Sequence, residues 1–152
     1  GVMGPQLGKD LDGASTQIIS QLISGKFPMI PALSFPFIDV RDVAKLHLKA
    51  MITPEANGKR FIAAHTNPTW MHEIAEILYN AGYNKIKLKK APSFMLKLIG
   101  LIDNQTKSLV PMLDKFVPTD NSQTVEVLKW EPMPLEQAFI EHAKSITEIK
   151  NS

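Results

Sequence analysis

The stretch FPFIDVRDVAKLHLKAM, residues 35–51, changes its hydrophobic periodicity within a few residues. Phe37–Val40 has the composition of a short strand, and the following residues have helical spacing. We expect Asp42 to begin the helix, because an acidic side chain accepts backbone N–H groups and favours the helix dipole. Such a strand–helix unit normally belongs to a parallel sheet with further strands and with helices on both faces. The expected inward face of this helix is Val43, Leu46, His47, Ala50 and Met51.

The residues before this unit predict a strand, a loop and a helix. Gly1–Met3 has the pattern of the end of a buried strand, and residues 5–13 form a loop rich in Gly and Asp. Ser15 is the expected N-cap of the helix, which Gly25 ends. Three prolines between residues 28 and 36 then exclude a helix and any central strand. The expected apolar stripe of the helix is Ile18, Ile19, Leu22 and Ile23.

Two further strands and one helix are expected in the middle of the chain. Lys59–His65 has a continuous apolar centre, as in a buried parallel strand. Residues 84–91 alternate Ile and Leu with Lys, a pattern typical of an edge strand. Between them, Thr69 is the expected cap of a helix that ends at Gly82. The inward face of that helix is expected to be Met71, Ile74, Ala75 and Leu78.

The C-terminal third predicts helices only. Residues 93–116 are helical, with breaks expected at Gly100 and Pro111, and a short helix starts near Asp120–Ser122. Pro134 precedes a last helix, whose periodic apolar residues predict a buried face. The fold class is therefore α/β, with a few short strands and many helices. The expected face of the last helix is Leu135, Ala138, Phe139, His142, Ala143 and Ile146.

The composition narrows the classes of function. A net charge of +2 over 152 residues is too small to argue for nucleic acid or an anionic membrane as a partner. The chain has no cysteine, which excludes disulfides and favours a cytoplasmic location. No apolar run approaches the roughly 18 residues of a membrane span.

Several short motifs suggest chemistry that their context does not support. GVMGPQLG spaces three glycines, but Pro5 interrupts the loop and no helix follows directly, so a plain strand-to-loop turn is favoured over a phosphate loop. Tyr83 and Lys87 have Tyr-x-x-x-Lys spacing, yet they lie in a strand-like pattern, where four residues span about 13 Å. His47 and His142 fall on apolar helix faces, where a core role is favoured, and no metal site is predicted.

Four stretches in order carry a family resemblance: GVMGP at residues 1–5, the segment at 35–51, NGKRFIAA at 57–64, and the closing segment at 120–146. Together they resemble the C-terminal half of an extended short-chain dehydrogenase/reductase of the NAD-dependent epimerase/dehydratase superfamily. Within that superfamily they are most similar to the dihydroflavonol reductase/cinnamoyl-CoA reductase-like group. The resemblance implies a partial Rossmann-like fold, the last βα units of a doubly wound parallel sheet, with a mostly helical substrate-binding lobe.

The resemblance also implies that the catalytic residues and the substrate-binding residues lie in different halves of the full-length parent. In that family an N-terminal Rossmann half holds the phosphate loop, the catalytic Ser and the Tyr-x-x-x-Lys pair, none of which is in this sequence. Residues 1–152 would then be the C-terminal substrate-binding portion. NAD(P) is expected as the cofactor of the full-length parent, and none is expected on this portion alone, which should be inactive. No catalytic residue is therefore assigned.

The site residues follow from the same resemblance. The segment matching Gly1–Met3 passes the nicotinamide end of the cofactor, so Gly1 and Met3 are assigned to cofactor binding together with Ser15, which can face the carboxamide. The loop matching Phe35, Pro36 and Phe37 lies near the substrate. Asp39, Arg41 and Asp42 match the family's D-x-R-D motif and look architectural.

The expected activity of the parent is reduction of a small aldehyde or ketone, since the loop PMIPALSFP before residue 37 is apolar. Two alternatives remain open. One is the C-terminal part of a nucleotide-sugar epimerase or dehydratase, and the other is a non-enzymatic ligand-binding module. A homodimer, formed through an exposed sheet edge or apolar surface, is a further expectation.

Overall fold

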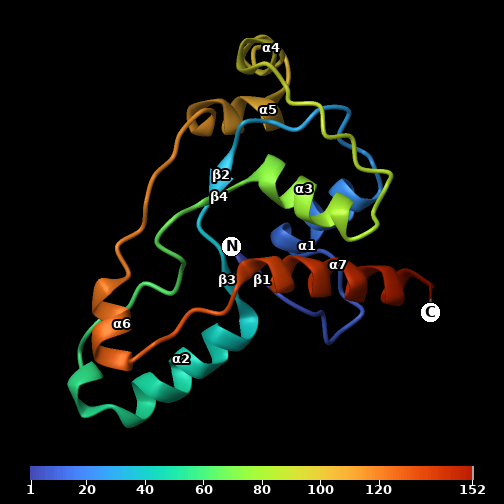
Figure 1. Ribbon diagram of the computed structural model, residues 1–152. Helices are drawn as coiled ribbons and strands as arrows, with labels where there is room; N and C mark the ends of the chain where they lie inside the picture. Colours follow the sequence, from blue (N-terminus) through green and yellow to red (C-terminus); the bar gives the residue numbers. More distant parts are fainter. Residues whose placement is uncertain (152) are drawn as a thin grey trace.

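The computed structural model describes residues 1–151, apart from the side chains of residues 104 and 105. Its short strands lie among helices of up to 17 residues (Figure 1). In chain order the elements are β1 (Val2–Met3), α1 (Ala14–Ile23), β2 (Ser34–Phe35), β3 (Ile38–Asp39), α2 (Val40–Ile52), η1 (Pro54–Ala56), β4 (Thr69–Trp70), α3 (Met71–Asn80), α4 (Ser93–Ile99), α5 (Asn104–Leu109), η2 (Val110–Met112), α6 (Ser122–Leu128) and α7 (Leu135–Asn151).

The strands form two small pairs. β1 and β3 are parallel, with Val2 opposite Ile38. β2 and β4 are antiparallel, with Ser34 opposite Trp70. The parallel pair is formed by strands 36 residues apart in register, which is the arrangement of a βαβ unit with α1 in the crossover. The predicted α/β class, with a small parallel sheet and many helices, is confirmed.

The main core lies where α1, α3 and α7 meet beside β1 and β3 (Figure 1). The rings of Phe37 and Phe139 cross edge to face, with centroids 5.4 Å apart. The inward face of α3 is the predicted one, and that of α7 contains five of its six predicted residues with Leu135 packed half-buried against them. A helix positions such a stripe by its own periodicity, so the apolar spacing was sufficient to predict it.

A second, smaller core joins α2 to α6 at the other end of the molecule (Figure 1). Leu46 of α2 packs there with Leu128 and Trp130. The expected face of α2 is partly wrong, because His47 and Met51 are exposed, Met51 at 82%. Val43 and Ala50 pack beside Leu46 in this core, so the buried face of α2 is narrower than predicted.

The cap of α2 differs from the prediction by three residues. Asp39, and not Asp42, is the N-cap, and its carboxylate accepts the backbone N–H of Arg41 at 2.7 Å. Asp42 lies in the first turn, is fully buried, and accepts the backbone N–H of Met133 at 2.8 Å. The strand therefore ends earlier than expected, and Asp42 instead holds the segment that leads into α7.

Two other predicted caps are also displaced. α1 begins after Gly13, so Ser15 is a first-turn residue and not the N-cap. α3 begins after Trp70, whose backbone N–H donates to the Glu73 carboxylate at 2.9 Å, and Thr69 instead belongs to β4. Glu73 stands three residues after the cap, which is the acceptor position of a capping box, and this interaction replaces a Thr cap.

The strand predicted at Lys59–His65 is wrong within the described residues. Carbonyl groups of this segment accept from side chains: Ile62 from Thr124 Oγ1 at 2.8 Å, and Ala64 from Asn121 Nδ2 at 2.8 Å. A strand needs a neighbouring backbone for these groups. The apolar run alone could not show that side chains of the α6 region would satisfy them instead.

The edge strand predicted at residues 84–91 is also wrong. The structure shows one parallel bridge there, between Ile30 and Lys90, and Ile86 is buried as the alternation predicted. The proline-rich stretch that runs alongside can pair only briefly, since proline has no N–H to donate. The helical prediction for residues 93–116 is correct as far as Met112, with α4 ending at the expected Gly100. Pro111 does not break the chain of helices but lies in a 3-10 turn that continues α5, and residues 113–116 are not helical. No helix of the described chain is long and apolar enough to cross a membrane.

Candidate functional site at the end of strand β1

A pocket of about 620 Å³ opens where β1 ends and α1 begins. Its walls come from the loop after β1, the first turn of α1, the start of α2 and one residue of α7. Ligands of parallel α/β sheets bind at this position, beyond the carboxyl end of a strand and at the N-terminus of the next helix. The lining residues include Met3, Gly4, Gln6, Ser15, Thr16, Val40 and His142.

His142 holds the loop of this pocket. Its Nδ1 accepts the backbone N–H of Gly4 at 3.3 Å, so the neutral ring carries its proton on Nε2. Nε2 lies 3.2 Å from Thr16 Oγ1, which accepts its proton and also accepts from the side-chain amide of Gln6 at 2.6 Å. Burial lowers the pKa of His142 below its ordinary value of 6.5, which makes the ring neutral near pH 7.

The sequence predicted the burial of His142 but none of its contacts. No sequence pattern marks Gln6 or Thr16, although both line the pocket. Their partners lie more than 120 residues away in the chain, at α7. No local pattern carries that information, and Ser145 adds a further contact of this kind by accepting the backbone N–H of Gln6 at 2.9 Å.

The first turn of α1 supplies hydrogen-bond donors to the pocket. Gly13 caps this helix without a side-chain acceptor, and no acidic residue stands in the first turn. The first N–H groups of a helix have no partner within the helix, and the dipole is positive at this end. Ala14, Ser15 and Thr16 therefore present donors to an oxygen atom of a ligand.

Residues assigned to cofactor binding and residues assigned to substrate binding lie close together around Gly1. A Cβ atom placed there would lie 2.8 Å from the ring of Phe37 and 3.4 Å from Ser15 Oγ. The Gly1 carbonyl accepts the backbone N–H of Ile38, and its nitrogen donates to the carbonyl of Pro36. Met3 is buried and lines the same pocket as Ser15.

The three residues assigned to the substrate separate into two environments. Phe35 and Pro36 line an apolar hollow of about 510 Å³ on the segment that leads to β3. Phe37 is only 2% exposed and packs against Phe139, so it contacts the hollow through Phe35, whose ring centroid is 6.2 Å away. The remaining lining of the hollow includes Ile62, Pro68, Pro111, Met112, Val117 and Pro118.

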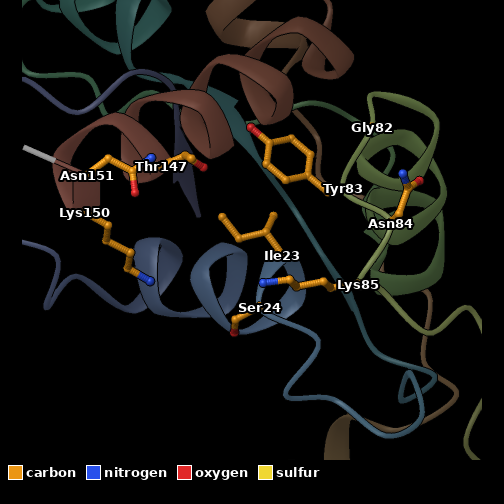
Figure 2. A pocket seen from close by; sticks show the side chains of 9 residues that line it. All are labelled: Ile23, Ser24, Gly82, Tyr83, Asn84, Lys85, Thr147, Lys150 and Asn151. Atoms are coloured by element: carbon orange, nitrogen blue, oxygen red, sulfur yellow. The ribbon is translucent and has the colours of Figure 1, made fainter.

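A further pocket, of about 420 Å³, lies between the C-terminal ends of α1 and α7 and the loop after α3 (Figure 2). Its lining residues come from these three segments and include Tyr83, Lys85 and Lys150. Tyr83 and Lys87 stand in this loop and not on a helix, so the helical i, i+4 arrangement that couples such a pair is not formed. The pocket has no carboxylate or histidine among its lining residues.

The D-x-R-D motif is architectural, as expected. Arg41 donates to the buried carboxylate of Asp39 and forms an ion pair of 2.8 Å with Glu141 on α7. It thereby joins the start of α2 to the helix that carries His142. Within the described part of the chain, no three metal-ligating side chains gather into a metal site.

Comparison with known proteins supports the resemblance. No protein-family model matches the chain. A ketoreductase of Penicillium rubens, adrE, is 32% identical over 91 residues, which are 59% of this chain and 27% of the ketoreductase. The homologous ketoreductase of Penicillium roqueforti is 30% identical over the same length. The match therefore spans about a quarter of these relatives.

Solved structures agree over almost the whole chain. Yeast methylglyoxal/isovaleraldehyde reductase Gre2, solved with NADPH, is 22% identical, with a TM-score of 0.66, 99% of this chain covered and 45% of that chain. UDP-glucose 4-epimerase of Thermotoga maritima, solved with UDP-glucose, is 19% identical, with a TM-score of 0.66 and coverages of 97% and 43%. The chain therefore shares its fold with somewhat under half of each of these two structures.

Proposed function

We propose that this chain is the substrate-binding portion of an NAD(P)-dependent reductase that acts on a small apolar aldehyde or ketone. The observation that carries the proposal is the contact at Gly1. There the pocket at the end of β1, through Ser15, meets the segment that lines the apolar hollow, through Pro36 and Phe37. A cofactor end and a substrate must touch for hydride transfer, and Gly1 lies close to Ser15 of the first cavity wall and donates to Pro36 of the second.

The pocket at the end of β1 fits the nicotinamide end of the cofactor. A carboxamide needs donors for its oxygen and acceptors for its nitrogen. The first turn of α1 offers free N–H groups, and Ser15 offers a hydroxyl group that does both. When bound, the cofactor supplies the hydride, and the role of Ser15 and Thr16 is to orient the ring.

The hollow beside Phe35 fits the body of the substrate. Its lining is mainly proline, aromatic and aliphatic side chains, which remove apolar surface from water without a directional requirement. Lys115 and Asp120 stand on its rim, where a polar substituent could meet them. The apolar lining favours a carbonyl compound over a sugar nucleotide.

The histidine of this pocket is not available as a proton donor to the reacting carbonyl. The histidine of the pocket, His142, uses Nδ1 to hold Gly4 and directs Nε2–H to Thr16, which occupies both ring nitrogens. A general acid has to be supplied within hydrogen-bond reach of the substrate oxygen. We therefore propose that residues 1–152 act together with an N-terminal dinucleotide-binding half that carries the Tyr-x-x-x-Lys pair.

Chemical-shift mapping of the isotope-labelled chain tests the proposal. NADP⁺ should bind weakly, with a Kd on the order of 1 mM, because the phosphate loop that supplies most affinity lies elsewhere. It should shift the amides of Gly4 and of Ala14–Thr16. An apolar ketone, 4-phenylbutan-2-one, should shift Phe35 and Ile62 and leave α1 unchanged.

A matched pair of variants on α1 gives the control. Ser15→Trp fills the pocket at the end of β1 and should abolish the NADP⁺ shifts. Ser24→Trp, at the other end of the same helix, should leave them unchanged. NADP⁺ shifts that survive Ser15→Trp, or NADPH-dependent turnover of the ketone by this chain alone, would contradict the proposal.

The epimerase alternative rests on a specific observation, the equal TM-score of the UDP-glucose 4-epimerase structure. The same titration separates the two functions. UDP-glucose that shifts Phe35 and Ile62 more strongly than the ketone would favour the epimerase. The encoding reading frame gives an independent check, since a glycine-rich loop and a Tyr-x-x-x-Lys pair should be encoded upstream of Gly1.

A further inference from the structure

A separate apolar cavity lies between the proline-rich stretch after α1 and the helices α4 and α5, which lie together at the end of the molecule opposite α2 (Figure 1). Its volume is about 220 Å³, and it shares no lining residue with the two cavities of the proposed reductase site. Thr106 supplies the one polar side chain of its lining. The lining residues are Phe27, Pro28, Met29, Pro31, Ala91, Met95, Leu96, Ile99, Thr106, Leu109 and Leu113.

The size of the cavity limits what it can hold. Apolar cavities of about 150 Å³ in other proteins stay dry and take up benzene. Pockets for drug-sized ligands start at about 300 Å³. At about 220 Å³ this cavity accommodates a single ring or a short alkyl chain. Two methionines in the wall, Met29 and Met95, can adjust their unbranched side chains to such an occupant.

The cavity opens to solvent through apolar side chains. Ile99 and Leu109 line it, and yet they are 38% and 40% exposed. A well-packed core would cover such residues, whereas an entrance leaves them in contact with water. An apolar ligand can therefore enter from the surface between α4 and α5.

The part of the chain that builds this cavity carries an excess of positive charge. Four exposed lysines directly adjoin lining residues in the chain, and the structure gives none of them a carboxylate partner among the described residues. One carboxylate, Asp114, also adjoins a lining residue, and it accepts a hydrogen bond from Ser93 at 2.7 Å. Around Gly82–Phe116 the chain carries seven lysines against two aspartates, although its overall net charge is only +2. The four lysines are Lys26, Lys90, Lys97 and Lys107.

We propose that this cavity binds an amphipathic anion, with a short alkyl chain or one aromatic ring inside and a carboxylate outside among the lysines. Burial of the apolar part supplies the affinity, and the lysines select the charge of the head group. The ligand class is a medium-chain or aryl carboxylate. The site is independent of the proposed reductase function, and either can fail without the other.

Octanoate is the probe for the first experiment, with methyl-labelled methionine as the readout. The chain has seven methionines, and Met29 and Met95 lie in the wall of the cavity. Octanoate should shift their methyl signals and leave the exposed Met51 unchanged. Octylammonium, with the same chain and the opposite charge, should bind at least about fivefold more weakly, and added salt should reduce that difference.

A matched pair of cavity-filling variants tests the location. Ala91→Leu fills the proposed site and should weaken octanoate binding by about tenfold. Ala50→Leu fills a pocket of similar size, about 190 Å³, beside α2 and should have no effect. Leu109→Gln, at the exposed entrance, gives a second variant that leaves the buried packing intact and should also weaken binding.

Three results would overturn the inference. The first is the absence of an octanoate-induced shift of the Met29 and Met95 methyl signals in the wild-type chain. The second is octylammonium that binds as tightly as octanoate, which would remove the role of the lysines. The third is equal loss of binding in Ala50→Leu and Ala91→Leu, which would indicate a general effect on folding.

Discussion

Arg41 donates two side-chain hydrogen bonds, of 2.9 and 2.7 Å, to the fully buried carboxylate of Asp39. These bonds hold the pKa of Asp39 below its ordinary value of 3.8. The same guanidinium reaches Glu141 of α7, so a single side chain connects the β3–α2 junction to the helix that positions the pocket loop. The D-x-R-D motif thus links the start of α2 to the helix that carries His142.

Arg41→Met should destabilise the chain by about 2 kcal/mol. Removing one partner of a buried ion pair typically costs about 3–5 kcal/mol, and Arg41 is 35% exposed, so solvent reduces the effect. Urea unfolding measures the change. The control is Lys144→Met, whose pair with Glu148 is exposed, and it should change the free energy of unfolding by less than about 0.5 kcal/mol. Equal effects of the two variants would contradict the structural role of Arg41.

The buried His142 should make stability depend on pH. Its pKa in the folded chain is below the ordinary value of 6.5, so the unfolded chain binds the proton more tightly. The stabilisation is therefore complete above about pH 6.5 and is lost as the pH falls through the folded pKa. His142→Gln should reduce the loss of Tm between about pH 7.5 and 5. His47→Gln, on the exposed side of α2, should keep the wild-type slope, and an unchanged slope in His142→Gln would refute the assignment.

Gly4 should not tolerate a side chain. Its φ is 136°, and a Cβ atom would lie 2.6 Å from Cγ1 of Val40. Gly4→Ala should cost about 1–3 kcal/mol. Adding Val40→Ala removes the contact but not the backbone strain, so the double variant should recover only part of the loss, which a double-mutant cycle measures. Gly8→Ala, with open space around it, should stay within about 0.5 kcal/mol of wild type.

Two other glycines separate backbone strain from steric contact. Gly25 and Gly58 have nearly the same φ, 71° and 69°. A Cβ atom at Gly25 would lie 2.5 Å from the carbonyl oxygen of Lys85, whereas nothing lies within 4 Å of one at Gly58. Gly58→Ala should cost about 1 kcal/mol for the left-handed conformation alone, and Gly25→Ala clearly more. Thermal unfolding compares them, and equal costs would show that the 82–86 loop can move away.

The helical part of this fold was accessible to sequence reasoning. The inward face of α3, from Met71 to Leu78, and that of α7, from Leu135 to Ile146, followed from apolar spacing. The break at Gly100 and the stop at Gly82 also appeared where expected. A helix satisfies its backbone within one segment, so its pattern is complete in the local sequence.

The tertiary structure decided the rest. Residues 59–65 have the composition of a strand, but the side chains of Asn121 and Thr124 donate hydrogen bonds to carbonyl groups of this segment. These donors lie about 60 positions away in the sequence. Two other features likewise join distant segments. Ser15 and Phe37 both lie close to Gly1, and the backbone N–H of Gly4 donates a hydrogen bond to His142. The amino-acid sequence alone determined which helix faces are buried. Only the packed fold determined which residues contact one another, because sheets and pockets are completed by partners that are distant in the sequence.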